Sequence, residues 1–156
     1  MKKIAVGIGV LMFIVICMGC AKGSGYHVNL DELKKINGTM LEIDDTPQGE
    51  MTEKEFNEQC STLSVSYAGY ANYTKSVNQE DVQITDQDLL TIYEFCLDAV
   101  ENGTYEKYSE DVDDGSTYSF IFYDENSEPH MLYSGYIYDN QKLSEIVQII
   151  ENYFEE

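Results

Sequence analysis

The chain has 156 residues and a formal net charge of −20, with 29 acidic residues against only 9 basic ones. This length fits one ordinary domain and argues against a large multidomain assembly. A surface this acidic repels nucleic-acid phosphates and anionic lipid headgroups, so we expect neither nucleic-acid binding nor electrostatic docking to a membrane.

The first twenty residues have the pattern of an export signal. Lys2 and Lys3 precede an unbroken apolar run over residues 4–18, and Gly19 and Cys20 follow it. A charged start, a short apolar region and a small residue before the cleavage point are typical of a signal peptide. The run is also shorter than the ~20 residues that a helix needs to cross a bilayer. An uncleaved N-terminal anchor is the alternative.

The Gly19-Cys20 junction resembles the lipobox of bacterial lipoproteins. That resemblance implies a signal peptide over residues 1–19 and a Cys20 that receives diacylglycerol and, with further acylation such as palmitate, holds the protein at the membrane. Several acyl chains anchor a protein firmly, whereas one chain anchors it only marginally. The sequence departs from the family pattern at Cys17, where leucine is usual, and at Met18, where a small residue is usual. The expected location is the extracytoplasmic face of the cell membrane.

Residues 20–50 are polar and predict a lipidated N-terminus followed by a flexible tether. Asn29 precedes an acidic turn, which favours a short helix ending near Asn37 and Gly38. Few apolar positions are available for burial in this stretch. We therefore expect the folded domain to span residues 51–156.

Within that domain, apolar patterning and capping residues predict an alternation of strands and helices. Thr52 with Glu55 forms a capping box for a helix over about 53–60, and Thr85 caps a longer helix that Gly103 ends. Period-two alternation predicts strands at 63–67, about 73–84, 117–123 and 131–138. An apolar stripe predicts a last helix over about 141–154.

The predicted elements form two similar halves, each a hairpin followed by a helix. Two ββα units predict an α+β fold with an antiparallel sheet of about four strands and both helices on one face. The other face of such a sheet must meet water, a partner or the N-terminal helix.

Tyrosines on the predicted strands are the first candidates for a binding surface. The chain has 13 tyrosines and no tryptophan. Exposed tyrosine rings combine rigid apolar area with a hydroxyl group, which suits binding to proteins or carbohydrates. Tyrosine also favours strands for packing reasons alone, and that interpretation stays open. The candidate binding residues are Tyr123, Tyr133, Tyr136 and Tyr138.

The acidic loop over residues 109–115 is a second candidate site. Asp111, Asp113 and Asp114 offer the oxygen ligands that calcium prefers, although the loop lacks the EF-hand spacing. A solvated connection is the alternative interpretation. Elsewhere, Cys60 and Cys96 could form a disulfide outside the cytoplasm, or Cys96 could be a free thiol on the apolar stripe of its helix.

No pattern predicts an enzyme or a cofactor. The two histidines, His27 and His130, have no nucleophile motif beside them, and no C-x-x-C is present. The mature part resembles small uncharacterised lipoproteins of Gram-positive bacteria in layout. We therefore expect a membrane-anchored extracytoplasmic lipoprotein that binds an envelope or extracellular protein. The alternative is a calcium- or cation-binding accessory lipoprotein that uses the acidic loop.

Overall fold

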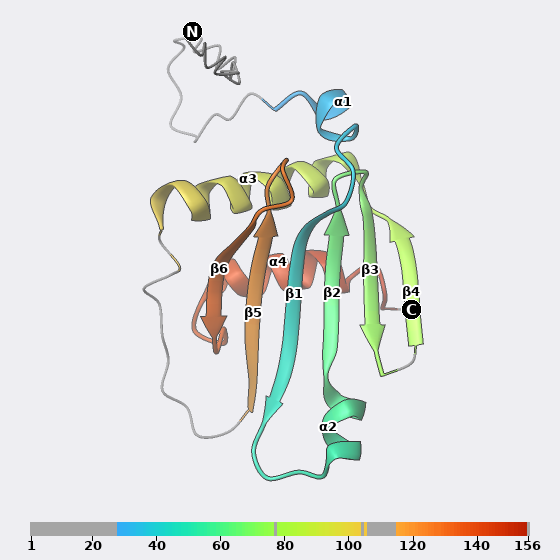
Figure 1. Ribbon diagram of the computed structural model, residues 1–156, viewed down its shortest axis with the longest axis vertical. Coiled ribbons are helices and arrows are strands. Elements are labelled where there is room, and N and C mark those ends of the chain that lie inside the picture. Colours follow the sequence, from blue (N-terminus) through green and yellow to red (C-terminus); the bar gives the residue numbers. More distant parts are fainter. Residues whose placement is uncertain (1–27, 77, 104, 106–114, 156) are drawn as a thin grey trace, which may run out of the picture.

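A six-stranded antiparallel sheet forms the centre of the computed structural model, with the strand order β4-β3-β2-β1-β5-β6 (Figure 1). The structure describes residues 28–76, 78–103, 105 and 115–155. The strands are β1 (Thr39–Gln48), β2 (Ser61–Ser66), β3 (Tyr70–Lys75), β4 (Asn78–Gln83), β5 (Gly115–Tyr123) and β6 (Pro129–Gly135). The helices are α1 (Leu30–Leu33), α2 (Glu53–Gln59), α3 (Asp86–Asn102) and α4 (Gln141–Glu151).

The α+β class matches the sequence-based expectation, but the sheet has six strands instead of about four. One additional strand is β1, which lies between β2 and β5 in the middle of the sheet. Its residues Met40, Leu41 and Ile43 are at most 1% exposed. The expected tether over residues 20–50 is therefore wrong for this part of the chain, and the folded domain begins well before residue 51.

Pro47, which made β1 harder to predict from the sequence, lies at the end of the strand, where β1 pairs only with β5. Pairing with β2 stops at Asp45, opposite Ser61, whereas pairing with β5 continues through Pro47 to Gln48. Proline has no N–H group and is tolerated where a strand edge is unpaired. The end of β1 therefore accommodates Pro47 without losing a central hydrogen bond.

The other additional strand comes from the segment over 73–84, which was expected to be a single strand. It contributes to two antiparallel strands, β3 and β4, with Lys75 opposite Asn78. β4 lies at the edge of the sheet, and its residues are mostly exposed and polar. Charged, exposed edge strands discourage pairing with other chains.

Irregularities in β1 and β6 bury adjacent residues that strict alternation would place on opposite faces. Along β6, Tyr133 pairs with Phe120 and Met131 pairs with Ile121, so Leu132 is an extra residue. Both Leu132 and Tyr133 are at most 2% exposed. A bulge of this kind places two residues against one on the neighbouring strand. The strand also ends at Gly135, whereas we expected it to continue to Tyr138.

The helix ends agree with the capping residues read from the sequence. The capping box of α2 is present: Glu55 N donates to Thr52 Oγ1 at 3.3 Å, and Thr52 N donates to a Glu55 carboxylate oxygen at 2.8 Å. Thr85 caps α3, which ends at Gly103 with a positive φ of 56°. α4 ends at Glu151, three residues earlier than expected.

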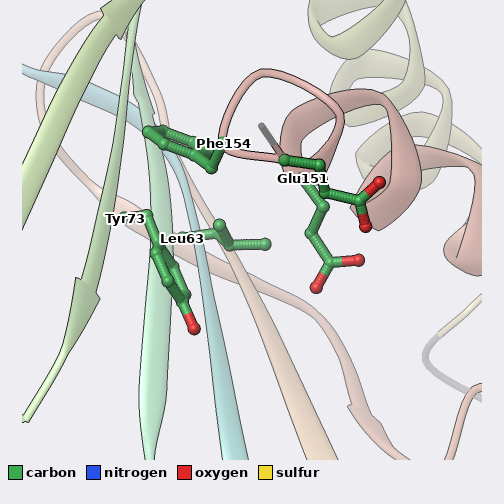
Figure 2. A pocket seen from close by; sticks show the side chains of 5 residues that line it. Leu63, Tyr73, Glu151 and Phe154 are labelled. Carbon is green, nitrogen blue, oxygen red and sulfur yellow. The ribbon is translucent and has the colours of Figure 1, made fainter.

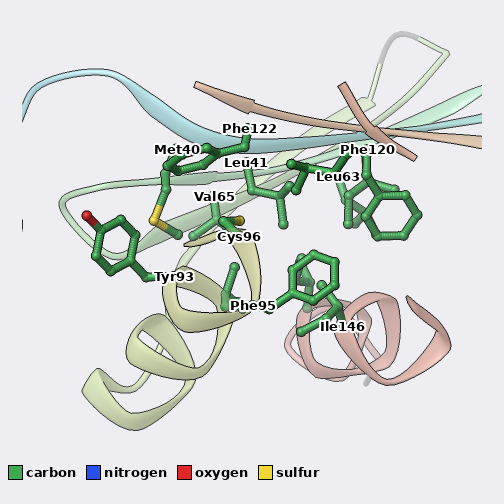
Figure 3. Close-up of a cluster of buried hydrophobic side chains, with 14 of the residues drawn as sticks. Met40, Leu41, Leu63, Val65, Tyr93, Phe95, Cys96, Phe120, Phe122 and Ile146 are labelled. Atoms are coloured by element: carbon green, nitrogen blue, oxygen red, sulfur yellow. The ribbon is translucent and has the colours of Figure 1, made fainter. Parts of the chain in front are cut away.

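The core lies between the sheet and the two long helices, both of which cover the same face (Figures 1 and 3). Figure 3 shows Leu41, Val65 and Phe120 pointing from the strands toward Phe95 of α3 and Ile146 of α4. The stripe of α4 is buried as expected: Leu143, Ile146, Val147 and Ile150. Among the described residues, no long helix lies over the opposite face of the sheet, and in that part of the structure one broad strand surface is left uncovered.

Candidate functional site

The register of the sheet assigns residues to its uncovered face. Side chains alternate along a strand, and cross-strand partners share a face. Leu41 and Ile43 of β1 point into the core. Glu42 and Asp44, which alternate with them along the strand, therefore point to the other face. We call this surface the open face. It comprises these strand residues and their cross-strand partners: Glu42, Asp44, Thr62, Ser64, Asn72, Thr74, Gln79, Asp81, Ser119, Ile121, Met131 and Ser134.

Two cross-strand rows cross the open face. In the first, Asp81 of β4 pairs with Asn72 of β3, Asn72 with Ser64 of β2, and Ser64 with Glu42 of β1. In the second, Thr74 pairs with Thr62, and Thr62 pairs with Asp44. Hydroxyl, amide and carboxylate groups thus lie side by side across four strands, which makes this a hydrogen-bonding surface.

Neutral donors orient the three carboxylates of the open face. Thr62 Oγ1 donates to Asp44 Oδ1 at 2.8 Å, and Asn72 Nδ2 donates to Asp81 Oδ1 at 2.7 Å. The Tyr123 hydroxyl donates to Glu42 Oε1 over a longer 3.4 Å. Thr74 Oγ1 in turn donates to Asn72 Oδ1 at 2.9 Å. These bonds hold the carboxylates in place without neutralising their charge.

The lysines of the described part of the chain are not among the open-face residues. Four of them form ion pairs elsewhere, as in the pairs of Lys35 with Glu32 at 2.6 Å and Lys54 with Glu58 at 3.6 Å. The others are Lys34 with Asp86 and Lys142 with Glu145. Lys75 is opposite Ser61, which places it in the same register row as Asp45 on the helix-covered side. The negative charge of the open face therefore has no lysine partner among the described residues.

A hollow of about 380 Å³ lies at the α2 end of the open face. Thr62 and Thr74 of the second row line it together with Asn57, Cys60, Ser61 and Ser76. Partial burial, followed by the charges of Asp45 and Asp44, raises the pKa of the Cys60 thiol. The hollow is thus a polar recess beside a carboxylate, with a protonated thiol at neutral pH.

A smaller cavity of about 200 Å³ lies on the helix-covered side, between β2, β3 and the chain after α4 (Figure 2). Leu63, Tyr73 and Phe154 form its apolar walls, and Glu151 and Glu155 line it as well. The rings of Tyr73 and Phe154 are 5.7 Å apart. Burial, then the charges of Glu155 and Asp45, raises the pKa of Glu151.

Asp45, whose charge acts on Glu151, lies on the same side of the sheet. Among the described residues its Oδ1 atom is buried without a hydrogen-bond partner. Burial, and then the Asp45 carboxylate, raises the pKa of Tyr118 to about 12. Repulsion among carboxylates therefore characterises this side of the sheet, whereas neutral donors accompany the carboxylates of the open face.

The four candidate tyrosines do not form one surface. Tyr133 is 1% exposed, and its hydroxyl donates to the backbone oxygen of Tyr136, so it belongs to the core and is not the exposed ring that we expected. Tyr138 is 67% exposed, but it lies after β6 in the connection to α4. Tyr136 packs beside Gly115, where an added Cβ would be 3.4 Å from its ring. Only Tyr123 borders the open face, through its bond to Glu42.

Of the two cysteines that could have formed a disulfide, Cys60 lines the hollow of the open face, whereas Cys96 lies in the core. Cys96 is buried in α3, and Cys60 caps the end of α2; both are free thiols in the structure. Asp111, Asp113, Asp114 and Cys20 lie outside the described residues. In the described part of the chain, no three metal-ligating side chains come together. None of the helices in that part is long and apolar enough to cross a membrane.

Sequence reasoning missed the residues of β1 that define the open face. Glu42 and Asp44 fell in the stretch expected to be a tether. Their signal was the alternation of Leu41, Glu42, Ile43 and Asp44, which has the period of a half-buried strand. The partners of these residues on β2 and β5 follow only from the sheet register.

Comparison with known proteins gives no match: neither a family model, nor a curated protein, nor a solved structure matches this chain. The fold therefore defines only a class, an α+β protein with a six-stranded antiparallel sheet and four helices among the described residues.

Proposed function

We propose that this protein is a lipid-anchored module that binds a partner protein outside the cytoplasm through the open face of its sheet. The proposed location outside the cytoplasm rests on the sequence, in which Gly19-Cys20 follows a short apolar run. Acylation of Cys20 would hold the domain at the membrane and leave the sheet free to meet an envelope or extracellular protein. In this proposal the chain acts by binding and not by catalysis.

One observation carries the choice of surface: three carboxylates on the open face are oriented by neutral donors from neighbouring strands. A surface of pre-positioned polar groups loses little side-chain entropy when a partner docks. The hollow beside Thr62 gives this surface a recess. The tyrosines favoured by the sequence support this less well, because Tyr133 is buried and Tyr138 lies in a connection.

Site-specific photocrosslinking in intact cells tests the surface. A photoreactive amino acid replaces Ser64 or, in a second variant, Ser119, both on the open face. The control replaces Glu94 on α3, which covers the other face. We expect the same discrete adduct from both open-face positions and not from Glu94. Adducts of equal yield at all three positions, or none at Ser64 and Ser119, would contradict the proposal.

Substitution of Cys20 tests the anchor separately. Cys20→Ser should abolish labelling by a palmitate analogue and release the protein from the membrane fraction, whereas Cys17→Ser should leave both unchanged. Continued lipid labelling of the Cys20→Ser variant would refute the assigned lipidation site without touching the argument about the open face.

A further inference from the structure

We infer that the partner bound at the open face presents a basic segment, with lysine or arginine side chains that pair with Glu42, Asp44 and Asp81. This inference rests on the proposed function, and it adds the chemistry of the partner. Charge complementarity supports a basic partner, because the open face has carboxylates and, among the described residues, no lysine.

The hydrogen bonds of these carboxylates favour cationic ligands over neutral ones. Asp44 and Asp81 each accept a bond from a neutral side chain at one oxygen, Oδ1. A carboxylate has about four lone-pair sites, so each retains acceptor capacity after that bond. A charge-assisted bond from an ammonium or guanidinium group is roughly twice as strong as a neutral one. A basic side chain therefore gains most at these positions.

The spacing of the carboxylates fits an extended basic segment. Glu42 and Asp44 are two residues apart on one strand, which places their Cα atoms roughly 7 Å apart. Alternate residues of an extended peptide have the same spacing, so two such lysines can meet the two carboxylates. Asp81 lies in the row of Glu42 but three strands away, at roughly 14 Å, where a third cation can reach it.

Net charge acts in the same direction over a longer range. The chain as a whole carries −20. Such a field attracts a basic partner and accelerates association at low salt, but it does not select a particular face. Selection must come from the oriented carboxylates, and this separates the inference from simple attraction between opposite net charges.

A fluorescence titration of the full chain in neutral detergent distinguishes these contributions. The probe is a synthetic peptide of alternating lysine and serine with one tryptophan, because the protein contains no tryptophan of its own. Parallel titrations use the same peptide with glutamate in place of lysine, and the free polyamine spermine as a competitor. We expect the lysine peptide to bind, its affinity to fall steeply between about 50 and 500 mM NaCl, and the glutamate peptide not to bind.

Two matched triple variants locate the binding. E42Q/D44N/D81N removes three charges from the open face, and E94Q/D98N/E101Q removes three charges from α3. We expect the first to weaken peptide binding by about tenfold or more and the second by less than about twofold. Circular dichroism of both variants should match that of the unsubstituted protein.

Several results would overturn the inference. The first is an equal loss of affinity for the lysine peptide in the two triple variants, and the second is the absence of lysine-peptide binding. The third is full displacement of the peptide by equimolar spermine, which would indicate a site for small cations. The outcome is separable from that of photocrosslinking: adducts at Ser64 without lysine-peptide binding refute only the basic partner. Failure of both experiments refutes the proposed function as well.

Discussion

The hydroxyl of Tyr153, just beyond the end of α4, donates to the carboxylate of Asp88 in the first turn of α3. The same hydroxyl accepts a bond from the backbone N–H of Thr85 at 3.0 Å. The end of one long helix is thereby joined to the start of the other. Because both helices cover the same face of the sheet, this contact joins the two parts of that helical layer.

Removal of the Tyr153 hydroxyl tests whether this contact between the two helices stabilises the protein. Tyr153→Phe keeps the ring and deletes both hydrogen bonds, so we expect the free energy of unfolding to fall by about 1–2 kcal/mol. Urea unfolding followed by circular dichroism measures the change. Tyr138→Phe is the control, because Tyr138 is 67% exposed, and it should leave the midpoint unchanged. Equal stability of the two variants would argue against the contact.

The placement of β1 inside the sheet gives a second prediction. Ile43 is 1% exposed between β2 and β5, so Ile43→Ala should cost about 2–5 kcal/mol of unfolding free energy. Thr39→Ala at the exposed start of the strand should change stability by less than about 0.5 kcal/mol. If Ile43→Ala unfolds at the same urea concentration as the unsubstituted protein, residues 39–48 are not part of the core.

Glu151 gives a prediction about pH. Burial and nearby carboxylates raise its pKa in the folded state above the ordinary value. The folded protein therefore binds this proton more tightly than the unfolded chain, and the associated stability is present at low pH and lost as pH rises through the raised pKa. Glu151→Gln should be more stable than the unsubstituted protein at pH 7, by up to about 0.5 kcal/mol because solvent screens the charges.

The pH dependence of that difference provides the check. Thermal unfolding of both proteins at pH 7 and at pH 4 should show the advantage of Glu151→Gln shrinking in acid, where the native carboxyl is itself protonated. An advantage that grows toward low pH would contradict the assigned direction.

The two free thiols should differ in reactivity. Cys96 is fully buried, and burial raises the pKa of its thiol, so it should react with iodoacetamide only after unfolding. Cys60 is partly exposed and should react in the native protein at pH 8.5, slowly because its own pKa is raised. Peptide mass spectrometry reads each site separately. Native labelling of Cys96 at the rate of Cys60 would show that α3 does not pack as described.

Local signals predicted the helices well, because caps and apolar stripes depend on residues close in sequence. Thr85 and Gly103 bound α3 as expected, and the stripe from Leu143 to Ile150 is the buried face of α4. The strand β1 was missed because adjacent aspartates at 44 and 45 and Pro47 lower its apparent strand character. Its burial comes from pairing with β2 and β5, which lie at a distance along the chain.

The candidate surface depended still more on nonlocal structure. Alternation alone placed Tyr133 among the binding candidates, whereas the extra residue Leu132 in β6 allows both side chains to be buried. Likewise, Asp81 and Glu42 are far apart in sequence and share a row only because four strands align. A composition rich in acidic residues could not indicate which of them gather on one face.

Carbodiimide footprinting of carboxylates in intact cells tests most directly whether the open face binds a partner. We predict that Glu42, Asp44 and Asp81 are labelled less in cells than in the purified protein, whereas Glu94 and Asp98 on α3 are labelled equally in both. Peptide mass spectrometry quantifies each site. Equal labelling of the three open-face carboxylates in cells and in the purified protein would contradict the claim that this face is occupied.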